Sequence, residues 1–409
     1  MMITRREWLQ AAAAVAAATA RPRAAGPDPI DVTMARAAEV IRGYSGEGWH
    51  RTATSVDRAS ADRLLALARS AGASPRLDAF DLQRVDPVEQ FVELDGRRID
   101  GLVMFDAPFT AATGVAGTLG RSDSDRPIAF SRIAPNGEAA LRPIRLDDRR
   151  RAIVIATTGV HPGLCPVNAA WFSEPFGPPV LQVSSEHVDL FDRAAAAGST
   201  VRVVAAATRQ PATAFNVVAD VAGRRRDLPP VCVMTPRSGW HANASERGGG
   251  LVCWLEALRA AAAARPLRAI HFVASSGHEL GHLGLHAYLD RHRTLAGDAF
   301  GWVHFGANIG TSTGDVGMTV SDAALGAAVH GALGRYDLDR LREVSADRVS
   351  GEAATISRAG GRFVSFIGQN AWFHHPHDLW PDAVDIRGVA RFARASADLV
   401  LALANAAAS

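Results

Sequence analysis

The pattern of hydrophobic positions predicts that strands and helices alternate through the second half of the chain. Short apolar runs rich in β-branched residues have the length of buried strands, and stretches with apolar residues at helical spacing lie between and after them. This alternation predicts an α/β fold, a mixed and mainly parallel sheet with helices on both faces. The predicted strands cover residues 216–219, 231–234, 268–274 and 302–305, and the predicted helices cover 249–264, 280–293 and 386–407.

The first half of the chain has a different pattern. Residues 57–70 have helical spacing and end near Gly72, a good helix cap, before an alternating stretch around 77–82. The following segment is richer in Pro, Gly and short β-like runs, which is typical of an inserted β-rich domain with its own small core. We therefore expect the first part of the main domain, the insert, and the rest of the main domain at residues 30–100, 101–210 and 211–409.

The N-terminal residues resemble a twin-arginine export signal. Arg5 and Arg6 precede an Ala-rich apolar run that extends to about Ala20. That run is too short to span a bilayer with its flanks, and no later segment reaches about 18 uninterrupted apolar residues. We expect residues 1–25 to be an export signal and the mature chain to be periplasmic or secreted, without an integral membrane segment. The alternative is an ordinary Ala-rich helix with a chance arginine pair.

Composition narrows the classes of partner. Among the 409 residues, Lys and Arg number 44 and Asp and Glu 42, so no overall field would hold nucleic acid. A small molecule or a peptide is the expected partner. The 48% of hydrophobic residues are enough for a large core. Three widely spaced cysteines, Cys165, Cys232 and Cys253, form neither a disulfide framework nor a thiolate metal site.

Polar residues gather in three segments that follow or closely precede apolar structure. Ligands bind beyond the carboxyl ends of the strands in sheets of this kind, so we expect the chemistry there. The three segments are 235–250 (TPRSGWHANASERGGG), 275–285 (SSGHELGHLGL) and 373–378 (FHHPHD).

The order of these segments resembles that of the zinc aminopeptidases of metallopeptidase family twenty-eight, which also includes glutaminyl cyclases. The shared features are a carboxylate before a Gly-rich helix start, a Gly-x-Glu-x-Gly-x-x-Gly loop at 277–284, and a late His-x-Pro-x-Asp at 374–378. Residues 48–54 (GWHRTAT) resemble a stretch near the start of many members, and 101–210 resemble their protease-associated insert. The resemblance implies a zinc-exopeptidase-like fold and a zinc-dependent hydrolase of amide or peptide bonds, acting on a peptide or small amide substrate.

Members of the family usually hold two zinc ions, and only half of that ligand set is present. By resemblance, Glu246 takes the place of the bridging Asp, Glu279 that of the second Glu of a Glu-Glu pair, and His374 that of the final His. The ligands specific to the other ion fall on Pro236 and Ala307, which bind no metal. Two carboxylates and an imidazole form an adequate open zinc site, so we expect one ion rather than two.

Further roles follow from the same resemblance. His278 falls on the general base, and a neutral imidazole can accept a proton from metal-bound water. Arg237, His304 and Asn308 are the expected hydrogen-bond donors to the substrate carbonyl. Asp378 is the expected orienting neighbour of His374, and Arg247 an expected partner of Glu246. These assignments concern residues of the three polar segments and the strand that precedes Asn308.

Several alternatives stay open. Glu246 could be a structural carboxylate at a helix N-terminus, paired with Arg247. The site could have lost catalysis and serve a binding protein on the same fold, or it could carry out acyl transfer or cyclisation. Residues 278–282 also match the zincin pattern His-Glu-x-x-His, but that pattern requires a helix, and Gly281 and the preceding strand argue against one.

Overall fold

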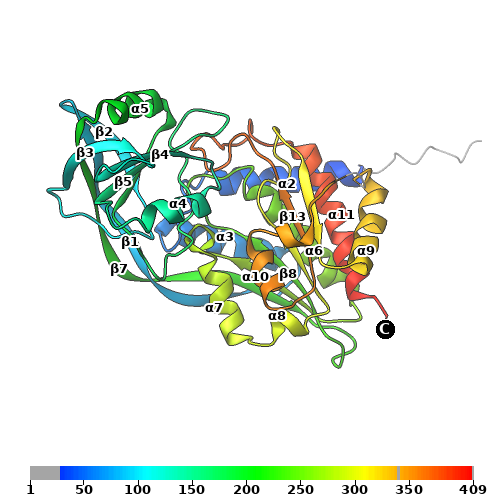
Figure 1. Ribbon diagram of the computed structural model, residues 1–409. Helices are drawn as coiled ribbons and strands as arrows, with labels where there is room; N and C mark the ends of the chain where they lie inside the picture. Colours follow the sequence, from blue (N-terminus) through cyan, green and yellow to red (C-terminus); the bar gives the residue numbers. More distant parts are fainter. Residues whose placement is uncertain (1–27, 339–340, 408–409) are drawn as a thin grey trace, which may run out of the picture.

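The computed structural model of the protein describes residues 28–338 and 341–407 (Figure 1). The predicted export signal at 1–25 lies outside the described residues. Within them, strands and helices alternate in the second half as the hydrophobic pattern predicts. The strands of that half are β8 (Val231–Pro236), β9 (Ile270–Ser275), β10 (Gly301–Phe305), β11 (Val316–Val320), β12 (Arg342–Glu343) and β13 (Phe363–Gly368).

These strands form a mixed, mainly parallel sheet, which confirms the predicted fold class. Its order is β7-β9-β8-β10-β13-β11-β12, where β7 is Thr200–Val221. The four central strands β9, β8, β10 and β13 run parallel, whereas β7 and β11 are antiparallel to their neighbours β9 and β13. The carboxyl ends of the four central strands therefore meet at one edge of the sheet.

Helices cover both faces of this sheet (Figure 1). One face packs into a core that includes Ile41, Leu64, Trp254 and Leu399, and the other into a core that includes Tyr288. The first face is covered by α2 (Pro29–Ser45), α3 (Ser55–Ser70), α6 (Gly248–Ala264), α9 (Ala323–Leu333) and α11 (Ile386–Ala404). The second is covered by α7 (Leu283–Arg291), α8 (Leu295–Asp298) and α10 (Glu352–Arg358).

Two long antiparallel strands, β7 and β1 (Arg76–Leu94), connect the main sheet to a smaller β-rich part at the other end of the molecule (Figure 1). There the strand order β1-β2-β6-β5-β4-β3-β7 closes on itself, because β7 also pairs with β1. The remaining elements are β2 (Arg97–Val103), β3 (Val115–Arg121), β4 (Ile128–Ile133), β5 (Ala152–Thr157), β6 (Val180–Val183), α4 (Glu138–Arg145) and α5 (Val188–Ala197). Of these elements, β3 to β6, α4 and α5 lie within the segment predicted as an insert, whereas β2 begins before it; the protease-associated identity of that segment stays a prediction.

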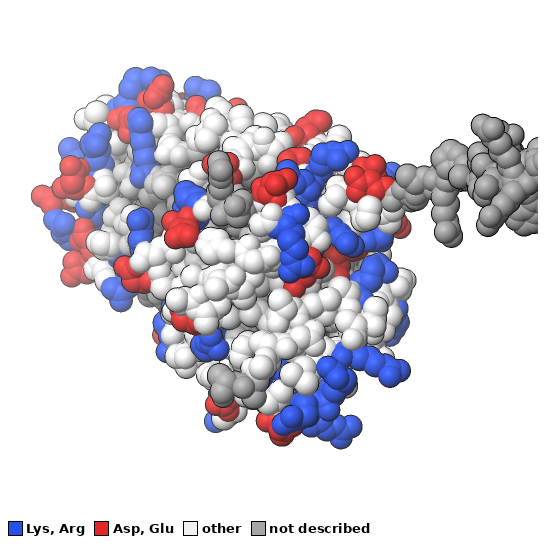
Figure 2. All heavy atoms as spheres, turned by 90° about the vertical axis from the view of Figure 1, so that its right-hand side faces the viewer, with Lys and Arg blue, Asp and Glu red and all other residues white. Residues whose placement is uncertain are grey.

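Three further observations bear on the sequence-based expectations. The cysteines Cys165, Cys232 and Cys253 are free and buried. No helix among the described residues is long and apolar enough to cross a membrane. On the face drawn in Figure 2, acidic and basic side chains are interspersed.

Candidate active site

A sharp turn follows β9 and carries residues 278–282. Gly277 and Gly281 adopt positive φ angles of 83° and 75°, which glycine enters without the steric cost of a Cβ atom. The residues between them form a single 3-10 turn. Helix α7 therefore begins at Leu283, later than the predicted helix over 280–293. The His-Glu-x-x-His segment is not part of a helix, as a zincin site would require.

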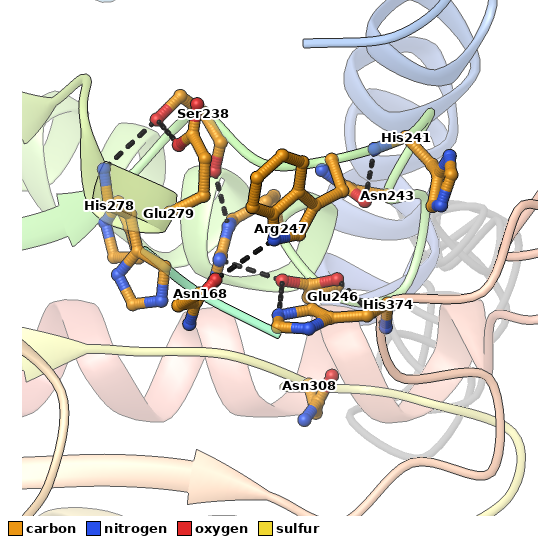
Figure 3. Close-up of polar contacts among 12 residues, drawn as sticks. Asn168, Ser238, His241, Asn243, Glu246, Arg247, His278, Glu279, Asn308 and His374 are labelled. Carbon is orange, nitrogen blue, oxygen red and sulfur yellow. Dashed lines mark hydrogen bonds and ion pairs between the residues drawn. The ribbon is translucent and has the colours of Figure 1, made fainter. Parts of the chain in front are cut away.

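Glu279, a predicted metal ligand, is held by hydroxyl and amide donors. Its Oε1 accepts hydrogen bonds from the Thr52 amide (2.8 Å) and the Thr52 hydroxyl (2.6 Å). Its Oε2 accepts a hydrogen bond from the Ser238 hydroxyl at 2.7 Å. Figure 3 shows the carboxylate turned toward Ser238. Both oxygens of this buried side chain are thus engaged within the protein.

The other two predicted ligands, Glu246 and His374, do meet. His374 Nε2 lies 3.6 Å from Glu246 Oε1, and neither atom has a hydrogen-bond partner among the described residues. Arg247 Nη2, however, lies 2.7 Å from the same carboxylate oxygen, and both residues are fully buried (Figure 3). Burial opposes the charge of Glu246, but Arg247 and His374 hold its pKa below the usual value. Burial lowers the pKa of His374 to about 4.

His278, the predicted general base, faces a carboxylate that the sequence analysis did not identify. Its Nδ1 lies 2.8 Å from Glu352 Oε1, and His304 Nε2 lies 3.1 Å from Glu352 Oε2. His304 Nδ1 in turn contacts the Ser365 hydroxyl at 2.8 Å. Burial alone would raise the pKa of Glu352, but the surrounding imidazoles hold it well below the usual range. A buried carboxylate is thus fixed between His278 of the turn after β9 and His304 of β10.

A third imidazole approaches the same carboxylate. His282 is left-handed at φ 64°, a conformation that costs a residue with a Cβ atom about 1–2 kcal/mol. Its ring centroid lies 5.1 Å from that of His278. One potential donor atom from each of His278, His282 and Glu352 lies within 4.8 Å of the other two. These residues form a cluster with the donor types of a metal site.

The cluster opens into a cavity of about 990 Å³ between the main sheet and the β-rich part. One wall comes from the β-rich part and includes Glu138 of α4 and Asn168. Glu138 Oε1 accepts a hydrogen bond from the backbone amide of Asn168 at 3.0 Å. Burial raises the pKa of the Glu138 carboxyl. The main domain contributes His278, His282, His304, Asn308, Glu352 and Asn370, among others.

The remaining predicted residues differ in their relation to this cavity. Asn308 lines it, but its amide is engaged: Nδ2 donates to the Gly368 carbonyl at 3.0 Å. Arg237 instead pairs with Asp57 at 2.9 Å and donates to backbone carbonyls in the interior. Asp378 accepts hydrogen bonds from the Ser245 and Glu246 amides, and burial raises its pKa to about 7. It therefore supports the loop that carries Glu246.

Solved structures share this architecture. An aminopeptidase from Aneurinibacillus sp. superposes with a TM-score of 0.70 at 14% identity, covering 91% of this chain and 94% of that chain. A zinc aminopeptidase from Bacillus subtilis gives 0.70 at 15% identity, with the same coverage. A peptidase M28 precursor from Shewanella amazonensis gives 0.73 at 15% identity, covering 92% and 96%. The chain has the fold of a zinc aminopeptidase. No protein-family model matches the sequence, and no curated protein matches it.

On this zinc-aminopeptidase fold, three of the predicted site residues, His278, His304 and Asn308, line the cavity, together with Glu138, His282 and Glu352, which were not predicted as site residues. Glu138 and Glu352 escaped the sequence analysis because neither lies in a recognisable motif. Glu352 follows His278 by 74 residues and belongs to α10, a helix of seven residues. His282 was considered only as part of the zincin pattern. A Gly-flanked turn with two histidines four residues apart was the one signal that could have singled it out.

Proposed function

We propose that the protein is a hydrolase of amide bonds in peptides or peptide-like molecules, and that the cavity lined by Glu138, His278, His282 and His304, among others, is its active site. The fold supports this proposal, because similar structures include zinc aminopeptidases. The observation that carries it is the cavity itself. It lies at the carboxyl edge of the parallel strands, where such folds bind ligands, and it gathers titratable groups from both parts of the chain.

Hydrolysis of an amide requires that an attacking water lose a proton and that the leaving amine gain one. His278 and Glu138, on adjacent parts of the cavity wall, can each carry that proton. The raised pKa of Glu138 suits this role, because a general base works best when its pKa is close to the working pH. The Asn168 amide fixes its carboxylate in place.

The proposal includes dependence on zinc, because similar structures include a zinc aminopeptidase, and on one ion only, because Pro236 and Ala307 stand where the resemblance places the ligands specific to a second ion. The predicted ligands Glu246, Glu279 and His374 do not fit one ion in their observed arrangement. Glu246 Oε1 and His374 Nε2 lie 3.6 Å apart, but Arg247 Nη2 pairs with the same carboxylate oxygen at 2.7 Å and supplies a positive charge there. Both oxygens of Glu279 are bound elsewhere. No catalytic step is therefore assigned to an ion between these three residues.

We also propose that the enzyme works outside the cytoplasm, as a periplasmic or secreted protein. The support is the pair Arg5 and Arg6 ahead of an apolar run. Replacement of both arginines by lysine should retain the protein in the cytoplasmic fraction. Equal export of the wild type and this variant would refute a twin-arginine route.

A second candidate function is a binding protein without catalysis on the same fold. The buried pair of Arg247 and Glu246 favours it, because a guanidinium neutralises a carboxylate that the resemblance assigns to a metal. Acyl transfer or cyclisation in the same cavity is a third candidate. It would differ from hydrolysis because water is not incorporated into the product.

The test uses the full chain with a panel of aminoacyl amides, short peptides and esters in ¹⁸O-labelled water. We expect product that carries the label, and a loss of kcat of about 10²–10⁴-fold in Glu138→Gln if this carboxyl transfers the proton. Glu174→Gln, an exposed change in the same β-rich part, is the matched control and should keep wild-type activity. No turnover across the panel would refute the hydrolase, and unlabelled product would indicate acyl transfer.

A further inference from the structure

We propose that His278, His282 and Glu352 bind one divalent metal ion of the zinc class at the floor of the cavity. This site lies apart from Glu246, Glu279 and His374, the ligands that the family resemblance implies. It would give the proposed hydrolase its metal centre, and only its catalytic meaning rests on that proposed function. Binding of the ion stands on the geometry alone.

The three side chains have the spacing of a ligand set that is nearly closed. Their donor atoms lie within 4.8 Å of one another, and the Nδ1 of His278 lies 2.8 Å from the Oε1 of Glu352. A tetrahedral zinc ion with bonds of about 2.0–2.1 Å separates its ligand atoms by roughly 3.3 Å. This separation lies between the observed His278–Glu352 contact of 2.8 Å and the 4.8 Å within which all three donor atoms lie. Small side-chain rotations would therefore place the three donors around one ion.

The donor types are those of catalytic zinc sites. Two imidazoles and one carboxylate bind zinc in open sites that leave a fourth position for water or substrate. All three residues line the cavity, so the fourth position would face it. The amide carbonyl of a peptide-like substrate in that cavity could reach the ion directly.

The carboxylate has the outer contacts that metal ligands usually have. Glu352 Oε2 is bound by His304 Nε2 at 3.1 Å, and His304 is fixed from behind by the Ser365 hydroxyl at 2.8 Å. Such contacts orient a ligand before the ion arrives. They leave Oε1 of Glu352 directed toward His278.

The backbone at His282 is a second, independent indication. A histidine there adopts a left-handed conformation that glycine or asparagine would enter at lower cost. Strained residues of this kind persist where the local structure serves a function. Here the strain places the His282 ring near His278, with the ring centroids 5.1 Å apart. With His278 as a ligand, proton transfer in the proposed hydrolase falls to Glu138.

The test measures metal binding, independently of activity. The full chain is stripped with a chelator and titrated with Zn²⁺ by calorimetry and with Co²⁺ by visible absorption. The variants are His282→Asn, which suits the left-handed backbone, and Glu352→Gln, which keeps the side-chain shape. Controls are His286→Asn, one turn further along α7, and Glu246→Gln in the predicted ligand set. Thermal unfolding of each variant establishes that it is folded.

We expect one equivalent of metal in the wild type, with the absorption of a tetrahedral cobalt site. Loss of an outer-shell contact weakens metal binding by about 10–100-fold, so loss of a ligand in His282→Asn or Glu352→Gln should weaken it at least 100-fold. Both controls should bind like the wild type. The proposal is overturned if the wild type binds no metal, or if Glu246→Gln abolishes binding and His282→Asn does not.

The outcomes also separate this site from the proposed function. If the protein binds metal through His282 and Glu352 but cleaves nothing, the proposed metal site stands and the proposed hydrolase function is refuted. If the protein hydrolyses amides but takes up neither Zn²⁺ nor Co²⁺ in the titrations, the proposed metal site is refuted and the hydrolase stands without a metal.

Discussion

Removal of Arg247 should destabilise the fold strongly, because it leaves a buried carboxylate without a counter-charge. Arg247 Nη2 lies 2.7 Å from Glu246 Oε1, and neither side chain is exposed. At that distance and an effective dielectric constant of about 20, two unit charges attract by about 6 kcal/mol. Desolvation offsets part of this attraction in the intact pair, but loss of one partner from a buried pair costs about 3–5 kcal/mol.

We therefore expect Arg247→Met to lower the free energy of unfolding by about 3–5 kcal/mol, measured by urea denaturation with tryptophan fluorescence. The double variant with Glu246→Gln should lose less than the sum of the two single variants, by up to about 3 kcal/mol. Arg259→Met on α6 is the control, because Arg259 is partly exposed and its contact to Glu256 is 3.5 Å. It should cost less than about 1 kcal/mol. A similarly small loss in Arg247→Met, with additive effects in the double variant, would refute the reasoning.

Three smaller predictions concern stability. Burial lowers the pKa of His50 to about 3, so His50 stays neutral in the folded protein, whereas it gains a proton in the unfolded chain below about pH 6.5. The stability advantage of the wild type over His50→Asn, measured by urea titrations, should therefore shrink between pH 7 and pH 4. A Cβ atom at Gly249 would lie 1.6 Å from the Ile309 carbonyl oxygen, so Gly249→Ala should lower the free energy of unfolding by at least about 1–3 kcal/mol. Gly331 in α9 has open space around it, so the control Gly331→Ala should raise the free energy of unfolding by about 0.5–1 kcal/mol. Thr52→Val removes a hydroxyl from a buried carboxylate oxygen and should cost about 1–3 kcal/mol by the same measurement, and an unchanged urea midpoint would contradict that contact.

The hydrophobic pattern predicted β8, β9, β10 and part of β7 because each carries its own local signal, but it did not predict β11, β12 or β13. The run 231–234 lies within β8, and the amphipathic stretch 386–407 contains α11. The closure of the β-rich part could not be predicted from the sequence, because it depends on pairing of β1 with β7 over more than one hundred residues of sequence separation. No local pattern specifies that pairing.

Side-chain direction limited the prediction of the site. The motif placed Glu279 correctly in the chain, but its orientation depends on Thr52, which is 227 residues away. Glu352 illustrates the opposite case, because no motif marks it and it reaches His278 from α10, a helix that packs beside β10 and β13. Motif spacing thus identified which loops gather at the sheet edge, but not which of their side chains face one another.

The residue at position 238 accounts for the orientation of the Glu279 side chain. An aspartate at residue 238 would place two carboxylates side by side, and they would repel each other, because the Ser238 hydroxyl lies only 2.7 Å from Glu279 Oε2. Serine there supplies a hydroxyl that donates to Glu279 and also accepts the amides of Gly277 and His278. Ser238 therefore donates to Glu279 where a carboxylate would repel it, and it holds Glu279 in the protein interior. His278, next along the same 3-10 turn, then faces the cavity with Glu352 as its partner. The turn after β9 thus carries both Glu279, whose carboxylate oxygens are bound within the protein, and His278, which lines the cavity.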